Sequence, residues 1–340
     1  MLRVVPANEL KIGPEIYSMT RNPRGSCIIV NNADFHDHSL RCREGSQLDV
    51  DRMAGLFRQL HFNVSIASNL SAKETKDLLR GFQKAETQKD AECLAVILMS
   101  HGEDGVLYGS DGEKLHLDRD VYQLFDNENC PNLRGKPKLF FIPGSRGCMW
   151  DNGIHGLLET PGANEVSHEH SEARSCEAPP RDDKSCHVPE TASTVEERPE
   201  HCLPSSWQER KPETGCSDMY IAYATRPGYV SLKNEIIGSW FLSAVSEVFS
   251  QHACTLSLDG LMRRVSQNVM DRSAHDGSKQ TPSVTTIGWR KELYFNPGHH
   301  AQSKISVSAD RFFLLSVWAP YLIGTHTKNK VKRIYWVKDW

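Results

Sequence analysis

Hydrophobic and polar positions follow two different periods in the first part of the chain. Continuous apolar runs at 26–32, 93–100 and 138–142 predict buried strands. Residues 62–67 alternate apolar and polar side chains, which is typical of a strand with one covered face. Four short strands are therefore expected before residue 143.

Helical spacing separates these strands. From Gln47 to Leu60 the apolar residues recur at helical spacing, which predicts an amphipathic helix. Ser71 and Glu74 have the spacing of a capping box ahead of another apolar pattern, which predicts a helix beginning near residue 71. Strands that alternate with helices predict an α/β fold, in which a sheet carries helices on both faces.

A second patterned part lies further along the chain. Its predicted elements are, in order, a strand at 219–225, a helix from Ile236 to Phe249, a helix over 258–269, and strands at 282–288 and 292–295. These elements are expected to complete the same fold.

The residues between the two patterned parts have a different composition. Segment 148–216 is rich in Pro, Glu, Ser and His and lacks apolar periodicity, so an exposed, disordered linker is expected there. The first 14 residues are too few for a helical recruitment domain. The expected organisation is an N-terminal segment (1–14), a first part (15–147), the linker (148–216), a second part (217–298) and a C-terminal extension (299–340).

Composition narrows the functional classes. The chain has 340 residues, 39% of them hydrophobic, and a formal net charge of −3, which gives no electrostatic reason to expect nucleic acid or an acidic membrane as a partner. The ten cysteines include no C-x-x-C pair, and the N-terminus lacks the apolar core of a secretory signal. Reduced thiols, a cytoplasmic location, and neither a metal nor another cofactor are therefore expected.

The C-terminal extension contains an apolar run at 312–324, followed by a basic stretch at 328–333. The run has 13 residues and contains Pro320, so it is too short to cross a bilayer. One interpretation is a tail on a membrane surface. The favoured interpretation is a packed or disordered extension, with no membrane role.

Two neighbouring apolar strands end in residues that can carry chemistry. His101 follows the strand at 93–100, and Ser145 follows the strand at 138–142. Because the carboxyl ends of parallel strands meet at one edge of a sheet, these two side chains are expected to lie close together. A histidine beside a hydroxyl is a base and nucleophile pair, and the N–H groups of Gly102 and Ser145 could form an oxyanion hole.

Several blocks of the sequence resemble the caspase family of cysteine proteases. That family carries Q-A-C-[RQG]-G with a histidine about 50 residues upstream, and here His101 lies 44 residues before Ser145 in P-G-S-R-G. The other similar blocks are RCREGSQLDVDRM (41–53), GKPKLFFI (135–142), GSW (238–240) and KELYFNPG (291–298). The resemblance, to initiator and insect-type caspases above all, implies a caspase-like (caspase-hemoglobinase) fold with a central six-stranded, mostly parallel sheet.

The resemblance also implies roles for individual residues. His101 matches the general base, Gly102 the oxyanion donor, and Arg43 an arginine that binds the P1 aspartate of a substrate. It further implies that the linker separates a large from a small subunit and that caspases cut it after Asp. Candidate cleavage positions are Asp151, Asp182 and Asp183, although acidic residues are common in disordered linkers and none of the three is followed by a small residue.

The departures from the family pattern concentrate in one pocket. Ser145 stands at the cysteine's position and Pro143 at that of a glutamine lining the P1 pocket. Lys233 stands where the second P1-binding arginine is expected, and Leu232 where a tryptophan shapes the next subsite. A serine hydroxyl is far less acidic than a thiol, and lysine lacks the planar fork that matches a carboxylate. These coordinated losses indicate an active site that has decayed or been repurposed.

Three functional hypotheses follow. The first is a catalytically inactive caspase homologue that regulates apoptosis by pairing through 282–288, either with a caspase paralogue or with itself, as an activator or a decoy. The second is a residual endopeptidase, Asp-directed or of altered specificity, that uses Ser145 with His101. The third is a non-catalytic scaffold that binds through the linker or the C-terminal extension.

Two weaker readings concern cysteines and histidines. Cys148, three residues after Ser145, could be a displaced nucleophile, but it is expected to point elsewhere. The linker could bind a metal, but the spacing of its histidines and cysteines fits no zinc pattern, so a solvated linker is favoured. The linker residues concerned are His155, His168, His170, Cys176, Cys186, His187, His201 and Cys202.

Overall fold

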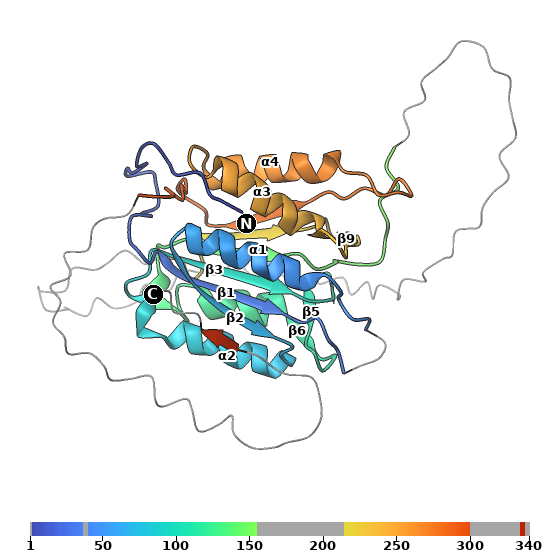
Figure 1. Cartoon of the computed structure of the whole chain (residues 1–340). Helices are drawn as coiled ribbons and strands as arrows, with labels where there is room; N and C mark the ends of the chain where they lie inside the picture. Colours follow the sequence, from blue (N-terminus) through green and yellow to red (C-terminus); the bar gives the residue numbers. More distant parts are fainter. Residues whose placement is uncertain (1, 37–39, 155–213, 300–333, 337–340) are drawn as a thin grey trace, which may run out of the picture. The chain divides into compact units, whose positions relative to one another are not determined.

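The computed structural model describes residues 2–36, 40–154, 214–299 and 334–336 (Figure 1). Its central feature is a seven-stranded sheet in the order β11-β8-β7-β3-β1-β2-β12. The strands are β1 (Gly25–Asn31), β2 (Phe62–Ser68), β3 (Cys93–Met99), β7 (Lys138–Ile142), β8 (Met219–Tyr223), β11 (Ser283–Ile287) and β12 (Ile334–Trp336).

Six of these strands form the expected mostly parallel sheet. β2, β1, β3, β7 and β8 run parallel to one another, and β11 pairs antiparallel with β8. The seventh strand, β12, comes from the C-terminal extension and pairs antiparallel with β2. This added strand was not predicted, although Ile334, Tyr335 and Trp336 are residues that favour strands.

Helices cover both faces of the sheet. The α-helices are α1 (Ser46–Gln59), α2 (Ala72–Lys84), α3 (Trp240–His252) and α4 (Leu258–Asp271). α1, α3 and α4 lie on one face, and α2 lies on the other (Figure 1). Short helical turns lie at η1 (Glu86–Gln88), η2 (Asp118–Tyr122), η3 (Gln123–Phe125) and η4 (Pro131–Leu133). Small sheets pair β4 (Gly102–Glu103), β5 (Val106–Tyr108) and β6 (Lys114–His116), and β9 (Lys233–Asn234) with β10 (Gly238–Ser239).

Coverage of both faces explains the continuous apolar runs. In β1, Cys27 and Ile29 face the core under α1, α3 and α4, whereas Ile28 and Val30 face the core on the α2 side. Because successive strand residues point to opposite faces, a strand that is buried on both sides needs apolar residues at every position.

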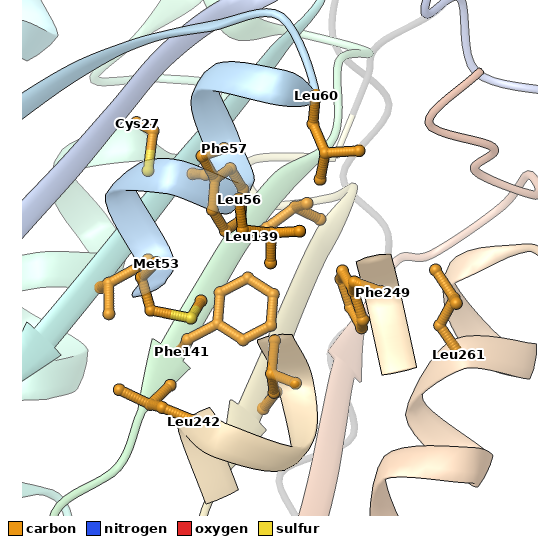
Figure 2. Close-up of a cluster of buried hydrophobic side chains, with 14 of the residues drawn as sticks. Cys27, Met53, Leu56, Phe57, Leu60, Leu139, Phe141, Leu242, Phe249 and Leu261 are labelled. Carbon is orange, nitrogen blue, oxygen red and sulfur yellow. The ribbon is translucent and has the colours of Figure 1, made fainter. Parts of the chain in front are cut away.

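One core joins the two patterned parts of the chain. The ring of Phe141 on β7 lies 5.9 Å from that of Phe57 on α1 and 6.2 Å from that of Phe249 on α3, both edge to face (Figure 2). All three rings are fully buried. The first and second parts therefore pack as one fold, because β7 and α1 precede the predicted linker and α3 follows it.

The start of α3 differs from the prediction. The sequence predicted a helix from Ile236, but α3 begins at Trp240, and Ile236 and Ile237 are exposed in the β9–β10 hairpin. Gly238 has a left-handed φ of 76°, which ends any helical run there. The Ser239 hydroxyl then accepts a hydrogen bond from the N–H of Leu242 and caps the helix.

The strand predicted at 292–295 is also wrong. This segment is extended but makes one isolated bridge, between Glu292 and Ile16. Its apolar residues Leu293 and Phe295 are fully buried in the core beneath α1, α3 and α4. Their alternation reflected packing against that core rather than pairing in a sheet. By contrast, the capping box of Ser71 and Glu74 at the start of α2 is confirmed.

Several predictions fall outside the described residues. These are Asp182, Asp183, the linker's histidines and cysteines, and the apolar run at 312–324. Within the described ranges, no helix has the length and apolarity needed to cross a membrane. The same ranges contain no group of three metal-ligating side chains.

Candidate active site

The loops that follow β3 and β7 lie in contact at the carboxyl edge of the sheet. β3 and β7 are parallel neighbours, so His101 and Ser145 leave the sheet on the same side. A methyl group at Gly102 would lie 3.4 Å from the carbonyl oxygen of Ser145 and only 2.4 Å from that of Val106. The backbone at Gly102 therefore approaches Val106 more closely than any larger residue would allow, whereas a methyl group would meet Ser145 at ordinary contact distance.

The imidazole of His101 is oriented by a backbone carbonyl. Its Nε2 lies 2.7 Å from the carbonyl oxygen of Arg41, and its ring lies 5.0 Å from the ring of Phe35. Because a carbonyl only accepts, Nε2 carries the proton, and in the neutral ring Nδ1 is the basic nitrogen. Burial lowers the pKa of His101, the hydrogen bond to Arg41 opposes this, and the positive charges of Arg43 and Lys233 add to the lowering.

The hydroxyl of Ser145 is engaged elsewhere. Its Oγ accepts a hydrogen bond from the backbone N–H of Ser231 at 3.0 Å. Among the described residues, no hydrogen bond joins Ser145 to His101. The half-buried serine is therefore an acceptor in this contact, and within the described ranges its hydroxyl does not donate to the imidazole.

Arg43 is held at the base of the site. Its side chain is 6% exposed and donates to the Asn31 side-chain oxygen at 3.0 Å and to the Asn32 carbonyl at 3.1 Å. Burial lowers the pKa of Arg43 to about 10, while the carboxylate of Asp49 raises it. The guanidinium is therefore still charged at neutral pH, and these two hydrogen bonds hold it at the end of β1.

Leu232 lies directly before β9, and Lys233 is the first residue of β9. The Lys233 amine donates to the carbonyl of Glu44 at 3.0 Å, and burial, followed by the charge of Arg43, lowers the pKa of Lys233. The N–H of Leu232 donates to the Gln280 side chain at 2.6 Å. Pro143 is buried directly after β7 and has no N–H to donate.

Three residues that position the site were not predicted. Arg41 acts through its carbonyl, for which a sequence gives no signal. Gln280 is 1% exposed and joins the N–H of Leu232 to the carbonyl of Ala224. Asp49 is 2% exposed in α1. Its position between the apolar residues Leu48 and Val50 is the feature of the sequence that could have indicated a buried carboxylate.

The segment after Ser145 is paired rather than free. Met149 and Asp151 make bridges with Tyr229 and Lys279, although both lie in the region predicted as a linker. The carbonyl of Asp151 accepts the N–H of Lys279 at 2.7 Å. Cys148 lies on this segment and is exposed.

Comparison with known proteins identifies the family to which this arrangement belongs. A family model of the caspase domain matches residues 24–294. The chain belongs to the caspase family. It is 31% identical over 290 residues to caspase-3 of Bos taurus, covering 83% of this chain and 88% of that protein. It is 30% identical over 291 residues to caspase-2 of Gallus gallus, of which it spans 61%.

A solved structure gives the same result for the fold. The crystal structure of caspase-1 from Spodoptera frugiperda is similar to this chain with a TM-score of 0.64 at 27% identity. The similarity covers 88% of this chain and all of that one. This caspase-family chain therefore carries the fold that its sequence blocks implied.

In this caspase-family chain, Arg146 connects the loop of Ser145 to the edge of the sheet. Its guanidinium lies 4.0 Å from the centre of the Tyr223 ring and 2.7 Å from the carboxylate of Asp104. It also donates to the hydroxyl of Ser283, the first residue of β11, at 3.3 Å. The residue next to Ser145 is thus bonded directly to the edge strand.

Proposed function

We propose that this caspase-family protein is a non-catalytic homologue that regulates apoptosis by pairing with an active caspase. The observation that carries the proposal is the Ser145 hydroxyl, which accepts the N–H of Ser231 and makes no hydrogen bond to His101. A hydroxyl attacks a carbonyl only when an oriented base removes its proton in the same step. The base is present here, but in the part of the chain that the structure describes no hydrogen bond joins the hydroxyl to it.

The contacts of Lys233 support the same proposal. A lysine at the position of a P1-binding arginine offers a point charge in place of a bidentate fork. Here the amine already donates to the Glu44 carbonyl, so binding an aspartate would require it to exchange that partner. The pocket is therefore weakened both in its nucleophile and in its grip on a carboxylate.

β11 is the surface proposed for pairing. It lies at one end of the sheet, with β8 on its inner side, and its central residues Val284, Thr285 and Thr286 are exposed. An open strand edge presents backbone groups that a second strand can bond. The proposed partner is a caspase paralogue or a second copy of this chain, joined edge to edge at β11.

Co-purification tests this proposal. Tagged full-length protein, mixed with purified active caspases, is expected to elute with at least one of them as a complex of two caspase domains. Alone, it is expected to show no cleavage of peptides carrying aspartate at P1. Elution apart from every caspase tried, together with unchanged caspase activity, would contradict the proposal.

One observation favours a second candidate, a residual hydrolase. The Arg41 carbonyl fixes His101 with Nδ1 as its basic nitrogen, as a general base requires. If the Ser231 contact opened, Ser145 could act as the nucleophile. A serine-directed phosphonate would then label Ser145, and the label would be lost in Ser145→Ala. Absence of labelling excludes this candidate and leaves the non-catalytic homologue.

A further inference from the structure

The chain after Ser145 is hydrogen-bonded through its backbone to the segment that leads into β9. Four backbone hydrogen bonds of 2.8–3.0 Å join residues 146–149 to residues 228–230. They run from the N–H of Arg146 to the Tyr229 carbonyl, from Gly228 to Arg146, from Met149 to Gly228, and from Val230 to Met149. The two segments approach so closely that a methyl group at Gly147 would lie 2.3 Å from the carbonyl oxygen of Gly228.

The Ser145 hydroxyl adds one side-chain hydrogen bond to these four backbone bonds. The backbone partners stop at Arg146 on one side and Val230 on the other. Ser145 precedes Arg146 and Ser231 follows Val230, and the acceptor between them is a side-chain oxygen, with Oγ 3.0 Å from the N–H of Ser231. The hydrogen bond therefore joins Ser231, the residue before Leu232 and Lys233, to the loop that follows β7.

We infer that Ser145 is a positioning residue, whose hydroxyl fastens the segment carrying Leu232 and Lys233 to the loop that follows β7. This inference goes beyond the proposed function, because it concerns what the hydroxyl does in the isolated chain. The segment from Ser231 is held on its other side by Gln280, which accepts the N–H of Leu232, and by the Lys233 contact to Glu44. Ser145 supplies the contact at the beginning of this segment, through the N–H of Ser231.

Oxygen suits this role better than sulfur. A hydroxyl oxygen is a good acceptor for a backbone N–H at 3.0 Å, whereas a thiol sulfur is a weak acceptor and needs a longer distance. Compared with cysteine, a serine at this position is therefore the weaker nucleophile and the stronger hydrogen-bond acceptor for the Ser231 N–H. The substitution is then explained by a gain in local order as well as by a loss of chemistry.

Hydrogen exchange at the Ser231 amide tests the inference. In the full-length protein, the exchange rate is resolved to single residues by electron-transfer fragmentation and mass spectrometry. Ser145→Ala is expected to accelerate exchange at Ser231 roughly fivefold, which corresponds to the loss of one net hydrogen bond. Ser145→Cys is expected to give a smaller acceleration, and the amides of Met149 and Val230 are expected to stay protected in both variants.

Ser110→Ala is the matched control. The Ser110 hydroxyl is buried and, like that of Ser145, makes one hydrogen bond, but it donates to the Asn69 carbonyl, and its loss should leave the Ser231 amide unchanged. Unchanged exchange at Ser231 in both Ser145 variants would overturn the inference. So would an acceleration that spreads equally over Met149 and Val230, or one that Ser110→Ala reproduces, because either result would reflect general loosening. No partner caspase enters the experiment, so its failure and that of the proposed pairing are distinguishable.

Discussion

The carboxylate of Asp49 in α1 accepts the backbone N–H of Ser239, the residue that caps α3, at 3.0 Å and 3.1 Å. The two residues come from the two halves of the fold. Next to them, Gly238 lies so close that a methyl group there would be 2.4 Å from the Asp49 oxygen. This contact sets the end of the β9–β10 hairpin, and with it the wall of the site that carries Lys233.

Loss of this carboxylate should destabilise the protein. Asp49→Ala leaves the buried N–H of Ser239 without its acceptor, so the free energy of unfolding is expected to fall by about 1–3 kcal/mol. Asp49→Asn keeps an acceptor oxygen and should cost less. Urea unfolding provides the measurement, and Asp51→Ala on the exposed side of α1 is the control, with an expected change within about 0.5 kcal/mol. Equal effects at both positions would show that the Ser239 contact contributes nothing special.

The environment of His101 predicts a pH dependence. Burial lowers its pKa below the ordinary 6.5, so the unfolded chain binds a proton more readily than the folded one. The contribution of His101 to stability is therefore complete above pH 6.5 and falls as the pH falls through the lowered pKa. NMR titration of the imidazole should give a midpoint below 6.5, and His101→Gln should flatten stability against pH in that window. A midpoint at or above 6.5 would contradict the buried, carbonyl-bound geometry.

Restoring the family residues should restore chemistry in steps. Ser145→Cys alone is expected to yield little cleavage after aspartate, because Lys233 and Pro143 leave the P1 pocket without its bidentate partner and its glutamine. The triple variant with Pro143→Gln and Lys233→Arg is expected to cleave such peptides at least tenfold faster than Ser145→Cys, since one well-formed charged hydrogen bond contributes about 1.5–3 kcal/mol. The assay is the rate of release of a fluorogenic group from a peptide with P1 aspartate. Full activity in the single variant would mean that the pocket had not been weakened.

The sheet and most helices were predictable because burial on both faces leaves a strong signal. β3 and β7 are apolar at nearly every position, β1 has an apolar run from Cys27 to Val30, and Ser71 and Glu74 mark the start of α2. The prediction of the start of α3 failed because apolar residues that precede the helix do not belong to it. Ile236 and Ile237 precede a buried helix but are exposed in a hairpin, since Gly238 and the Asp49 contact determine the start of α3.

The site was predictable in its members but not in their contacts. His101, Gly102 and Ser145 could be placed at one edge of the sheet from their positions after apolar strands. The orientation of His101 could not, because it depends on the Arg41 carbonyl, and every residue has a carbonyl. The partner of Ser145 is likewise a backbone N–H, at Ser231, brought there by pairing 86 residues along the chain.

The rate of a partner caspase in the presence of this protein tests the central claim most directly. An active caspase is titrated with the full-length protein while cleavage of a peptide with P1 aspartate is followed. The account predicts a saturable change in rate that Val284→Lys on β11 abolishes and that Met270→Lys on α4, a residue of matching exposure (39% and 38%), leaves intact. A rate that stays constant at every concentration, or a change that survives Val284→Lys, would contradict pairing through this strand.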